Sequence, residues 1–264
     1  MAAQESSPME SRIGVTDNPV NPVRALARRV LSRDTRRRLT NLLVWPPVGT
    51  VRFGSLRRLS PVSRDWGFDR GQPIDRYYIE RFLTTHAADI RGRVLEIDNN
   101  NYTSAFGGDR VTQSDVLHIS DWKPGVTMVG DLTKLDNVDS ELFDCVIVTQ
   151  TLQFIFDCRA ALRTIHRILR PGGVALVTVP AINKSRDEKG AFGDYWAFRT
   201  LSAQRLFEEL FPAEQVTVTG YGNVLAAVSF LHGLAAGELT SEELDQADRA
   251  YELLVGVRAR KPEE

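Results

Sequence analysis

A short apolar run followed by a polar turn contains the residue types and spacing that best fit a binding site. Val94, Leu95 and Ile97 form a run typical of a strand buried on both faces of a parallel sheet, and Glu96 lies inside it. Residues 98–101, one aspartate and three asparagines, form the turn. In nucleotide-binding strand-loop-helix units this turn is usually glycine-rich, so that backbone N–H groups can face the ligand. Asp and Asn tolerate left-handed backbone angles, so the turn stays possible although each adds a side chain.

The elements that must position this turn alternate between strands and helices. A helix is expected from Pro73 to about Ala88, because proline favours the first helical position. Residues 98–110 hold the whole first crossover, so its helix has barely two turns. Further strands are expected at 111–119, 126–129, 143–148, 174–179, 216–219 and 253–259, with helices at 158–169, 202–210 and 224–234. This alternation predicts an α/β fold with a doubly wound sheet.

The composition is that of an ordinary globular protein. Hydrophobic residues make up 42% of the 264 residues and charged residues 25%, and the net charge of -1 gives no global reason to expect nucleic acid. Cys145 lies in an apolar run with Cys158 just beyond it, which favours two buried thiols over a disulfide framework or a metal site. No apolar run approaches the ~18 residues of a membrane span, and a signal-peptide core is not seen, so a cytoplasmic protein is expected.

Three segments are expected along the chain. Residues 1–21 lack periodicity and are predicted to be a disordered leader. Residues 22–72 form a basic helical extension and loop, with seven arginines and one aspartate between residues 24 and 38. This amphipathic segment is either a solvated face packed on the domain or a contact with an anionic surface. Residues 73–264 form the main domain, and the sequence does not indicate an oligomeric state.

From about Pro73 onward the order of motifs resembles the class I S-adenosylmethionine-dependent methyltransferases, of the small-molecule, type 11-like kind. The most specific block begins with Phe143-Asp-Cys-Val-Ile-Val and ends with Leu169-Arg-Pro-Gly-Gly. The resemblance implies S-adenosylmethionine as cofactor. It also implies a Rossmann-like, mostly parallel seven-stranded sheet with an antiparallel last strand and helices on both faces.

The resemblance further implies roles for acidic residues after the second and third strands. Asp115 would accept hydrogen bonds from the two ribose hydroxyls of the cofactor, since that role needs a carboxylate. A helix cap is the alternative for this residue. Asp131, with the backbone of Leu132, would meet the adenine edge, unless the carboxylate only stabilises the turn after Gly130.

The methionine portion of the cofactor would face the opening turn. The resemblance assigns Glu96, Asp98, Asn99 and Asn100 to it, where a carboxylate suits the ammonium and the N–H groups of the following helix suit the carboxylate. Gln150 lies at the mouth of the fourth strand, as a ligand contact or as a buried polar spacer. The three glycines expected after the first strand are absent, and Asp98 could pair with the cofactor ammonium or repel its carboxylate.

The candidates for catalysis and acceptor binding lie outside these motifs. Methyl transfer needs alignment of donor and acceptor and, for a hydroxyl, removal of a proton. Asp194 is the candidate base, because it lies in a polar insertion after the fifth strand. Tyr195 and Trp196 would stack on a sugar or ring, or only hold the insertion in place. Tyr78, in a segment that also resembles the family, completes the acceptor candidates.

Three functions are compatible with these residues. The first is methyl transfer to a small hydroxylated acceptor, a sugar or secondary metabolite. The second is a methyltransferase-like binding protein that has lost the cofactor, because the turn at residues 98–101 is bulky. The third, a nicotinamide oxidoreductase, is disfavoured because G-x-G-x-x-G is missing and Pro171-Gly-Gly lies where methyltransferases have it.

Overall fold

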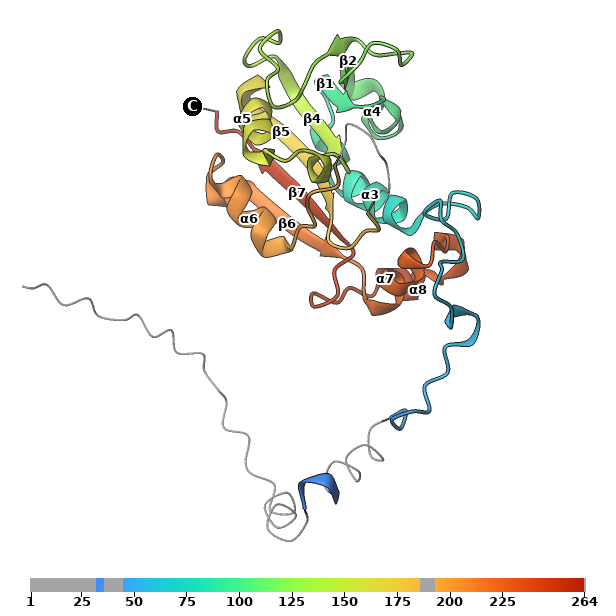
Figure 1. Ribbon diagram of the computed structural model, residues 1–264. Coiled ribbons are helices and arrows are strands. Elements are labelled where there is room, and N and C mark those ends of the chain that lie inside the picture. Colours follow the sequence, from blue (N-terminus) through green and yellow to red (C-terminus); the bar gives the residue numbers. More distant parts are fainter. Residues whose placement is uncertain (1–31, 36–44, 186–192, 264) are drawn as a thin grey trace, which may run out of the picture. The chain divides into compact units, whose positions relative to one another are not determined.

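A seven-stranded sheet forms the centre of the computed structural model, which describes residues 32–35, 45–185 and 193–263 (Figure 1). The strands lie in the order β3-β2-β1-β4-β5-β7-β6. Only β7 runs antiparallel to its neighbours β5 and β6. The bounds are β1 Gly92–Ile97, β2 Val111–His118, β3 Met128–Val129, β4 Phe143–Thr149, β5 Leu169–Pro180, β6 Val216–Tyr221 and β7 Leu254–Arg260. The predicted Rossmann-like fold with an antiparallel last strand is therefore confirmed.

Helices cover both faces of the sheet. They are α3 Ile74–Thr85, α4 Asn101–Gly107, α5 Cys158–Ile168, α6 Thr200–Glu208, α7 Val224–Leu231 and α8 Ser241–Asp245. One buried cluster joins the sheet to α5 and α6, and a second joins it to α3 and α7. Leu95 belongs to the first cluster and Val94 to the second, as the alternation of side chains along a strand requires. Cys145 and Cys158 are buried free thiols, as predicted.

Two elements differ from the prediction. Residues 170–173, which the prediction left between the helix at 158–169 and the strand at 174–179, lie inside β5, where Leu169 pairs with Phe143 before an irregularity in the register. Gly172, at φ +76°, provides the left-handed angle that this irregular stretch needs. The short α8 was not predicted, because five residues carry too little periodicity; its start is fixed by hydrogen bonds between Thr240 and Glu243.

The chain divides into two compact units, residues 1–57 and residues 58–264. Residues 58–72, which the expected boundary at residue 73 leaves outside the main domain, fall in the second unit. The backbone N–H groups of Val62 and Ser63 donate to the carbonyl of His232 at 2.8 and 3.1 Å, and Pro73 forms a bridge with Ala235. The expected leader and most of the expected basic helix lie outside the described residues. Within the described ranges, no helix is long and apolar enough to cross a membrane.

Candidate cofactor and acceptor site

The turn after β1 keeps the backbone shape of a glycine turn at its first residue. Asp98 has a φ of +77°, in the left-handed region, whereas Asn100 has an ordinary φ of -116°. The prediction that an Asp or Asn could take this conformation is thus confirmed for Asp98 alone. The crossover that follows contains the short helix α4, also as predicted.

Glu96 stabilises the turn from inside the protein. Its side chain is buried, and its carboxylate accepts hydrogen bonds from the N–H groups of Tyr102 and Thr103 at 3.2 and 2.7 Å and from the Thr103 hydroxyl at 2.7 Å. Burial raises the pKa of Glu96, and the hydrogen bonds from Thr103 oppose that rise. Asn99 accepts the N–H of Asn101 at 3.0 Å. The first N–H groups of α4 are thus engaged within the chain. The expectation that they and Glu96 meet the cofactor is corrected: they hold the turn in shape.

Asp98 carries the exposed charge of this turn. Its carboxylate pairs with Lys123, accepts from the side chain of Asn99 at 3.0 Å, and lies 3.8 Å from Nε2 of His118. Burial works to raise the pKa of Asp98, but hydrogen bonds from Lys123 and Asn99 outweigh it and lower the pKa. The Trp122 ring meets His118 edge-on at 5.7 Å. A negative charge is therefore held ionised at the end of β1.

The register between β1 and β2 decides which residue of β2 lies at the edge of the sheet, and it is not the expected Asp115. Leu95 of β1 lies opposite Asp115, and Ile97 lies opposite Leu117, so His118 is the β2 residue that ends beside the turn. Sequence reasoning missed His118, because its residue type alone does not reveal the register.

Asp115 lies inside the sheet. It is buried and pairs with Nε of Arg93 at 2.7 Å, and it accepts the hydroxyl of Thr127 at 3.1 Å. The ring of Phe143 lies 5.4 Å from the Arg93 guanidinium carbon. A carboxylate so placed neutralises an arginine within the fold. Its position does not favour the ribose contact expected for it, and it does not cap a helix either.

Asp131 forms an exposed turn after β3. One of its carboxylate oxygens accepts both the N–H and the hydroxyl of Thr133, each at 2.8 Å. This is the turn chemistry named as the alternative to adenine binding. The neighbouring Leu132 is buried in the core, so only its backbone remains for a ligand.

The end of β4 gathers polar side chains that lack partners. Gln150 has a φ of +47°, and its N–H donates to the carbonyl of Thr178 at 2.9 Å. The amide of Gln153 donates to Oε1 of Gln150 at 3.2 Å. Among the described side chains, Nε2 of Gln150, Oε1 of Gln153 and Oδ2 of Asp194 are buried without a hydrogen-bond partner. Such groups are costly to bury, which makes this edge of the sheet a candidate position for a ligand.

The insertion after β5 returns to this edge and brings aromatic rings with it. The N–H of Tyr195 donates to the carbonyl of Gln153 at 2.8 Å, and the indole of Trp196 donates to the carbonyl of Ile155 at 3.1 Å. Phe156 meets Tyr195 edge-on at 5.4 Å and stacks with Trp196 at 5.8 Å. The three exposed rings form one aromatic surface. Phe156 was missed, because nothing in the sequence pairs it with residues so much later in the chain.

Tyr78 does not reach this edge. Its side chain is only 2% exposed, and its hydroxyl donates to the carbonyl of Leu244 at 2.8 Å. Burial raises the pKa of the hydroxyl well above its usual range. The acceptor contact expected for Tyr78 is therefore corrected to a role in the core between α3 and α8.

Part of the sequence is matched by a family model. A model described as a methyltransferase domain matches residues 80–177, from within α3 to within β5. No curated protein matches this chain.

Several solved structures are similar to part of this chain. One is a SAM-dependent methyltransferase from Archaeoglobus fulgidus, at 11% identity over 70% of this chain and 94% of that one, with a TM-score of 0.49. Another is the N-methyltransferase NodS from Bradyrhizobium japonicum in complex with S-adenosyl-L-homocysteine, at 14% identity over 76% and 95%, with a TM-score of 0.45. The [4+2]-cyclase SpnF is 18% identical over 73% and 83%, with a TM-score of 0.43. By the family match, residues 80–177 lie in a methyltransferase domain whose methyl donor is S-adenosylmethionine.

Proposed function

We propose that this domain methylates a hydroxyl group of a small acceptor, a sugar or secondary metabolite, with Asp194 as the base. The observation that carries the proposal is the buried Oδ2 of Asp194, which has no hydrogen-bond partner among the described residues and belongs to the residue before Tyr195 of the aromatic surface. An unpaired carboxylate oxygen can accept the proton of a hydroxyl group, and exposed aromatic rings suit the apolar face of a sugar or ring.

The residues at the carboxyl edge of the sheet fit the cofactor. The left-handed backbone of Asp98 leaves the turn in the shape of a glycine turn, and its ionised carboxylate suits the ammonium of the methionine tail. The unpartnered Nε2 of Gln150 is a donor for the carboxylate of that tail. His118, which ends β2 beside Asp98, is the candidate for the ribose contact, and the exposed carboxylate of Asp131 is the candidate for the adenine amino group. Asn99 and Asn100 line the turn through their backbone.

The chain's own residues then perform the remaining chemistry. When bound, S-adenosylmethionine supplies a methyl group already activated on a sulfonium. Tyr195 and Trp196, with Phe156, orient the acceptor against the insertion. Asp194 accepts the hydroxyl proton at Oδ2 as the acceptor oxygen gains the methyl group.

A second candidate is a binding protein that no longer transfers methyl groups. It is favoured by one observation: the first N–H groups of α4 are already satisfied by Glu96 and Asn99, and those groups are the ones a helix start offers to an anion.

Cofactor binding separates the two functions. S-adenosylmethionine should raise the melting temperature of the protein, since a ligand at a hundredfold excess over its Kd adds about 2.7 kcal/mol to stability. Asp98→Lys should abolish this shift by repelling the ammonium, whereas Asp109→Lys, the same charge change at an exposed residue of the 3-10 helix Gly108–Arg110, should preserve it. Absence of any shift with the cofactor or its demethylated product would favour the binding protein.

The base is tested in a second experiment. With labelled S-adenosylmethionine and a panel of glycosides and hydroxylated metabolites, wild type should label an acceptor. Asp194→Asn should bind the cofactor as wild type does and lose labelling by about a hundredfold or more. Labelling that persists in Asp194→Asn would remove Asp194 as base without affecting the cofactor assignment.

A further inference from the structure

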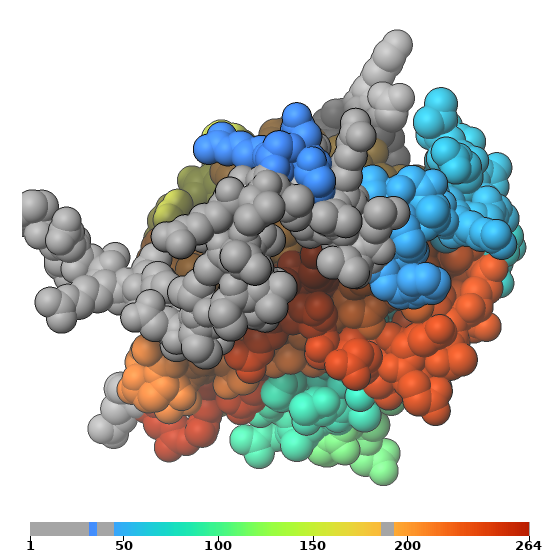
Figure 2. All heavy atoms as spheres, turned by 90° about the horizontal axis from the view of Figure 1, so that it is seen from below, coloured from blue at the N-terminus to red at the C-terminus, as the bar shows by residue number. Residues whose placement is uncertain are grey.

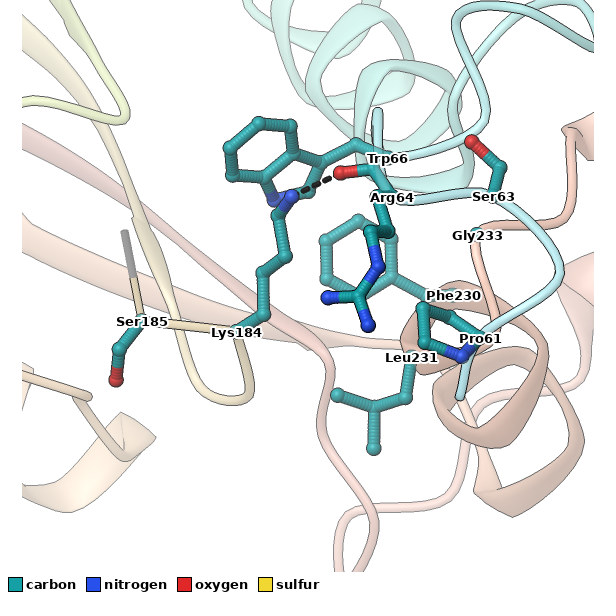
Figure 3. Close-up of a pocket in the computed structure, with 9 residues that line it drawn as sticks. All are labelled: Pro61, Ser63, Arg64, Trp66, Lys184, Ser185, Phe230, Leu231 and Gly233. Carbon is teal, nitrogen blue, oxygen red and sulfur yellow. Dashed lines mark hydrogen bonds between the residues drawn. The ribbon is translucent and has the colours of Figure 1, made fainter. Parts of the chain in front are cut away.

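A cavity of about 240 Å³ lies beside the end of β5 and belongs to no motif described above. Its walls come from three segments of the 58–264 unit: Pro61, Arg64 and Trp66 before α3, Lys184 after β5, and Phe230 and Leu231 at the end of α7 (Figure 3). Lys184 and Asp194 are at the two ends of the insertion, and both follow β5. Lys184 therefore follows the carboxyl end of β5, and the proposed cofactor residues follow the carboxyl ends of β1 and β4 in the same sheet.

Two cationic side chains line this cavity. The ammonium of Lys184 donates to the carbonyl of Arg64 and lies 3.4 Å from the centre of the Trp66 ring, whose N–H donates to the side chain of Asn183 at 3.0 Å. Lys184 is thus held in place. In the part of the chain that the structure describes, the guanidinium of Arg64 makes no hydrogen bond or ion pair. Among the residues that the structure describes around the cavity, none carries a carboxylate. The cavity therefore suits an anion, which a guanidinium binds through two parallel hydrogen bonds.

An apolar stripe leads away from the cations. Leu231 lines the cavity and is nevertheless half exposed, and Val228 and Val224 lie on the same face of α7 at helical spacing. The stripe is about 10 Å long, from the rise of 1.5 Å per helical residue. The α7 to α8 segment, orange-red in Figure 2, forms part of the molecular surface in that view. Three exposed aliphatic side chains in a row are unusual on a solvated helix and fit an apolar chain.

We propose that this cavity selects the acceptor by an acidic group, a carboxylate or a phosphate, with an apolar chain of the acceptor along α7. Of the acceptors in the proposed function, this selects a hydroxylated secondary metabolite that carries an acidic group and a single aliphatic chain. This proposal rests on the proposed function and names its substrate class. Charge complementarity selects the occupant, because the two cations match an acid and the adjoining stripe matches hydrocarbon.

The test uses decanoate, decyl phosphate, decanol and butyrate, each below its micelle-forming concentration, in calorimetric titrations of the full chain. Decanoate or decyl phosphate should bind, and whichever binds more tightly identifies the acidic group. Decanol lacks the charge and butyrate lacks the long chain. The affinity of each should therefore be at least about tenfold lower than that of decanoate. Arg64→Gln should weaken decanoate about tenfold, while Arg163→Gln, an exposed arginine on α5, should not change it.

A separate variant tests the apolar stripe on α7. Val228→Ser should remove the advantage of decanoate over butyrate and leave the effect of Arg64→Gln intact. Equal affinities of all four probes would overturn the proposal. Binding of the full chain to vesicles that contain phosphatidylglycerol, with no binding to the four soluble probes, would also overturn it. S-adenosylmethionine binding is measured on the same samples. If the cofactor binds but decanoate does not, only the acid site is refuted; if the cofactor does not bind either, the proposed function fails.

Discussion

Two carboxylates of the predicted site have opposite surroundings, and these surroundings decide their roles. Asp98 is exposed at the end of β1, with a pKa lowered by its hydrogen bonds to Lys123 and Asn99 despite partial burial. Asp115 is buried and forms an ion pair with Arg93. It lies opposite Leu95, two residues before Leu117, which is opposite the last residue of β1. Only a carboxylate that reaches the edge of a parallel sheet can meet a ligand there. Asp98 is therefore the candidate for binding, and Asp115 is a candidate for stability.

Replacing Asp115 by Asn should lower the free energy of unfolding by about 2–4 kcal/mol, because Arg93 loses its anionic partner inside the sheet. Urea denaturation measures this change. The folded variant should still bind S-adenosylmethionine within about threefold of wild type. The control Asp109→Asn, on an exposed turn, should alter neither quantity. If the variant were as stable as wild type but lost cofactor affinity, Asp115 would instead bind the cofactor ribose, as the sequence predicts.

The sequence shows which residues are acidic, but it does not show whether each one is buried within the sheet or lies at its edge. The order of strands and the short crossover could be predicted, because apolar runs and the 13-residue gap at 98–110 constrain them. Whether Asp115 or His118 ends β2 at the edge depends on pairing with β1, which the residue types do not encode. Tyr78 likewise finds its partner at Leu244, far along the chain. Contacts of this range form only when the elements pack.

At the scale of elements, α4 is too short to be stable by itself. It contains seven residues, fewer than an isolated helix needs in water. Its first turn is held by Glu96 of β1, which accepts the N–H groups of Tyr102 and Thr103. The strand thus holds the helix and fixes the shape of the turn between them. If the cofactor binds at this turn, as we propose, the buried side chain of Glu96 controls cofactor binding through the shape of the turn.

Glu96→Ala should lower the free energy of unfolding by about 2–4 kcal/mol, because two backbone donors and the Thr103 hydroxyl lose a buried acceptor. S-adenosylmethionine should no longer raise the melting temperature of this variant. Ser104→Ala, an exposed change on the same helix, should stay within about 0.5 kcal/mol of wild type and bind normally. Normal cofactor binding by Glu96→Ala would show that the turn keeps its shape without this carboxylate.

At the scale of the whole molecule, residues 58–72 belong to the folded domain rather than to the extension before it. This segment packs closely on the end of α7. A Cβ added to Gly67 would lie 2.8 Å from the carbonyl oxygen of Leu234, and the φ of Gly67 is +90°. Only glycine accommodates both constraints. The sequence alone gave no sign of this, because the segment is rich in loops and without periodicity.

Two truncated chains test this boundary. A chain that begins at Arg58 should melt within about 2 °C of the full-length protein, because the 58–264 unit retains its core. A chain that begins at Pro73 should melt about 5–10 °C lower, since it loses the hydrogen bonds of Val62 and Ser63 to His232 and the packing of Trp66. The shorter chain should also lose decanoate binding, because Arg64 is removed, and should still bind S-adenosylmethionine at low temperature. Equal melting temperatures for the two truncated chains would place the domain boundary at residue 73 after all.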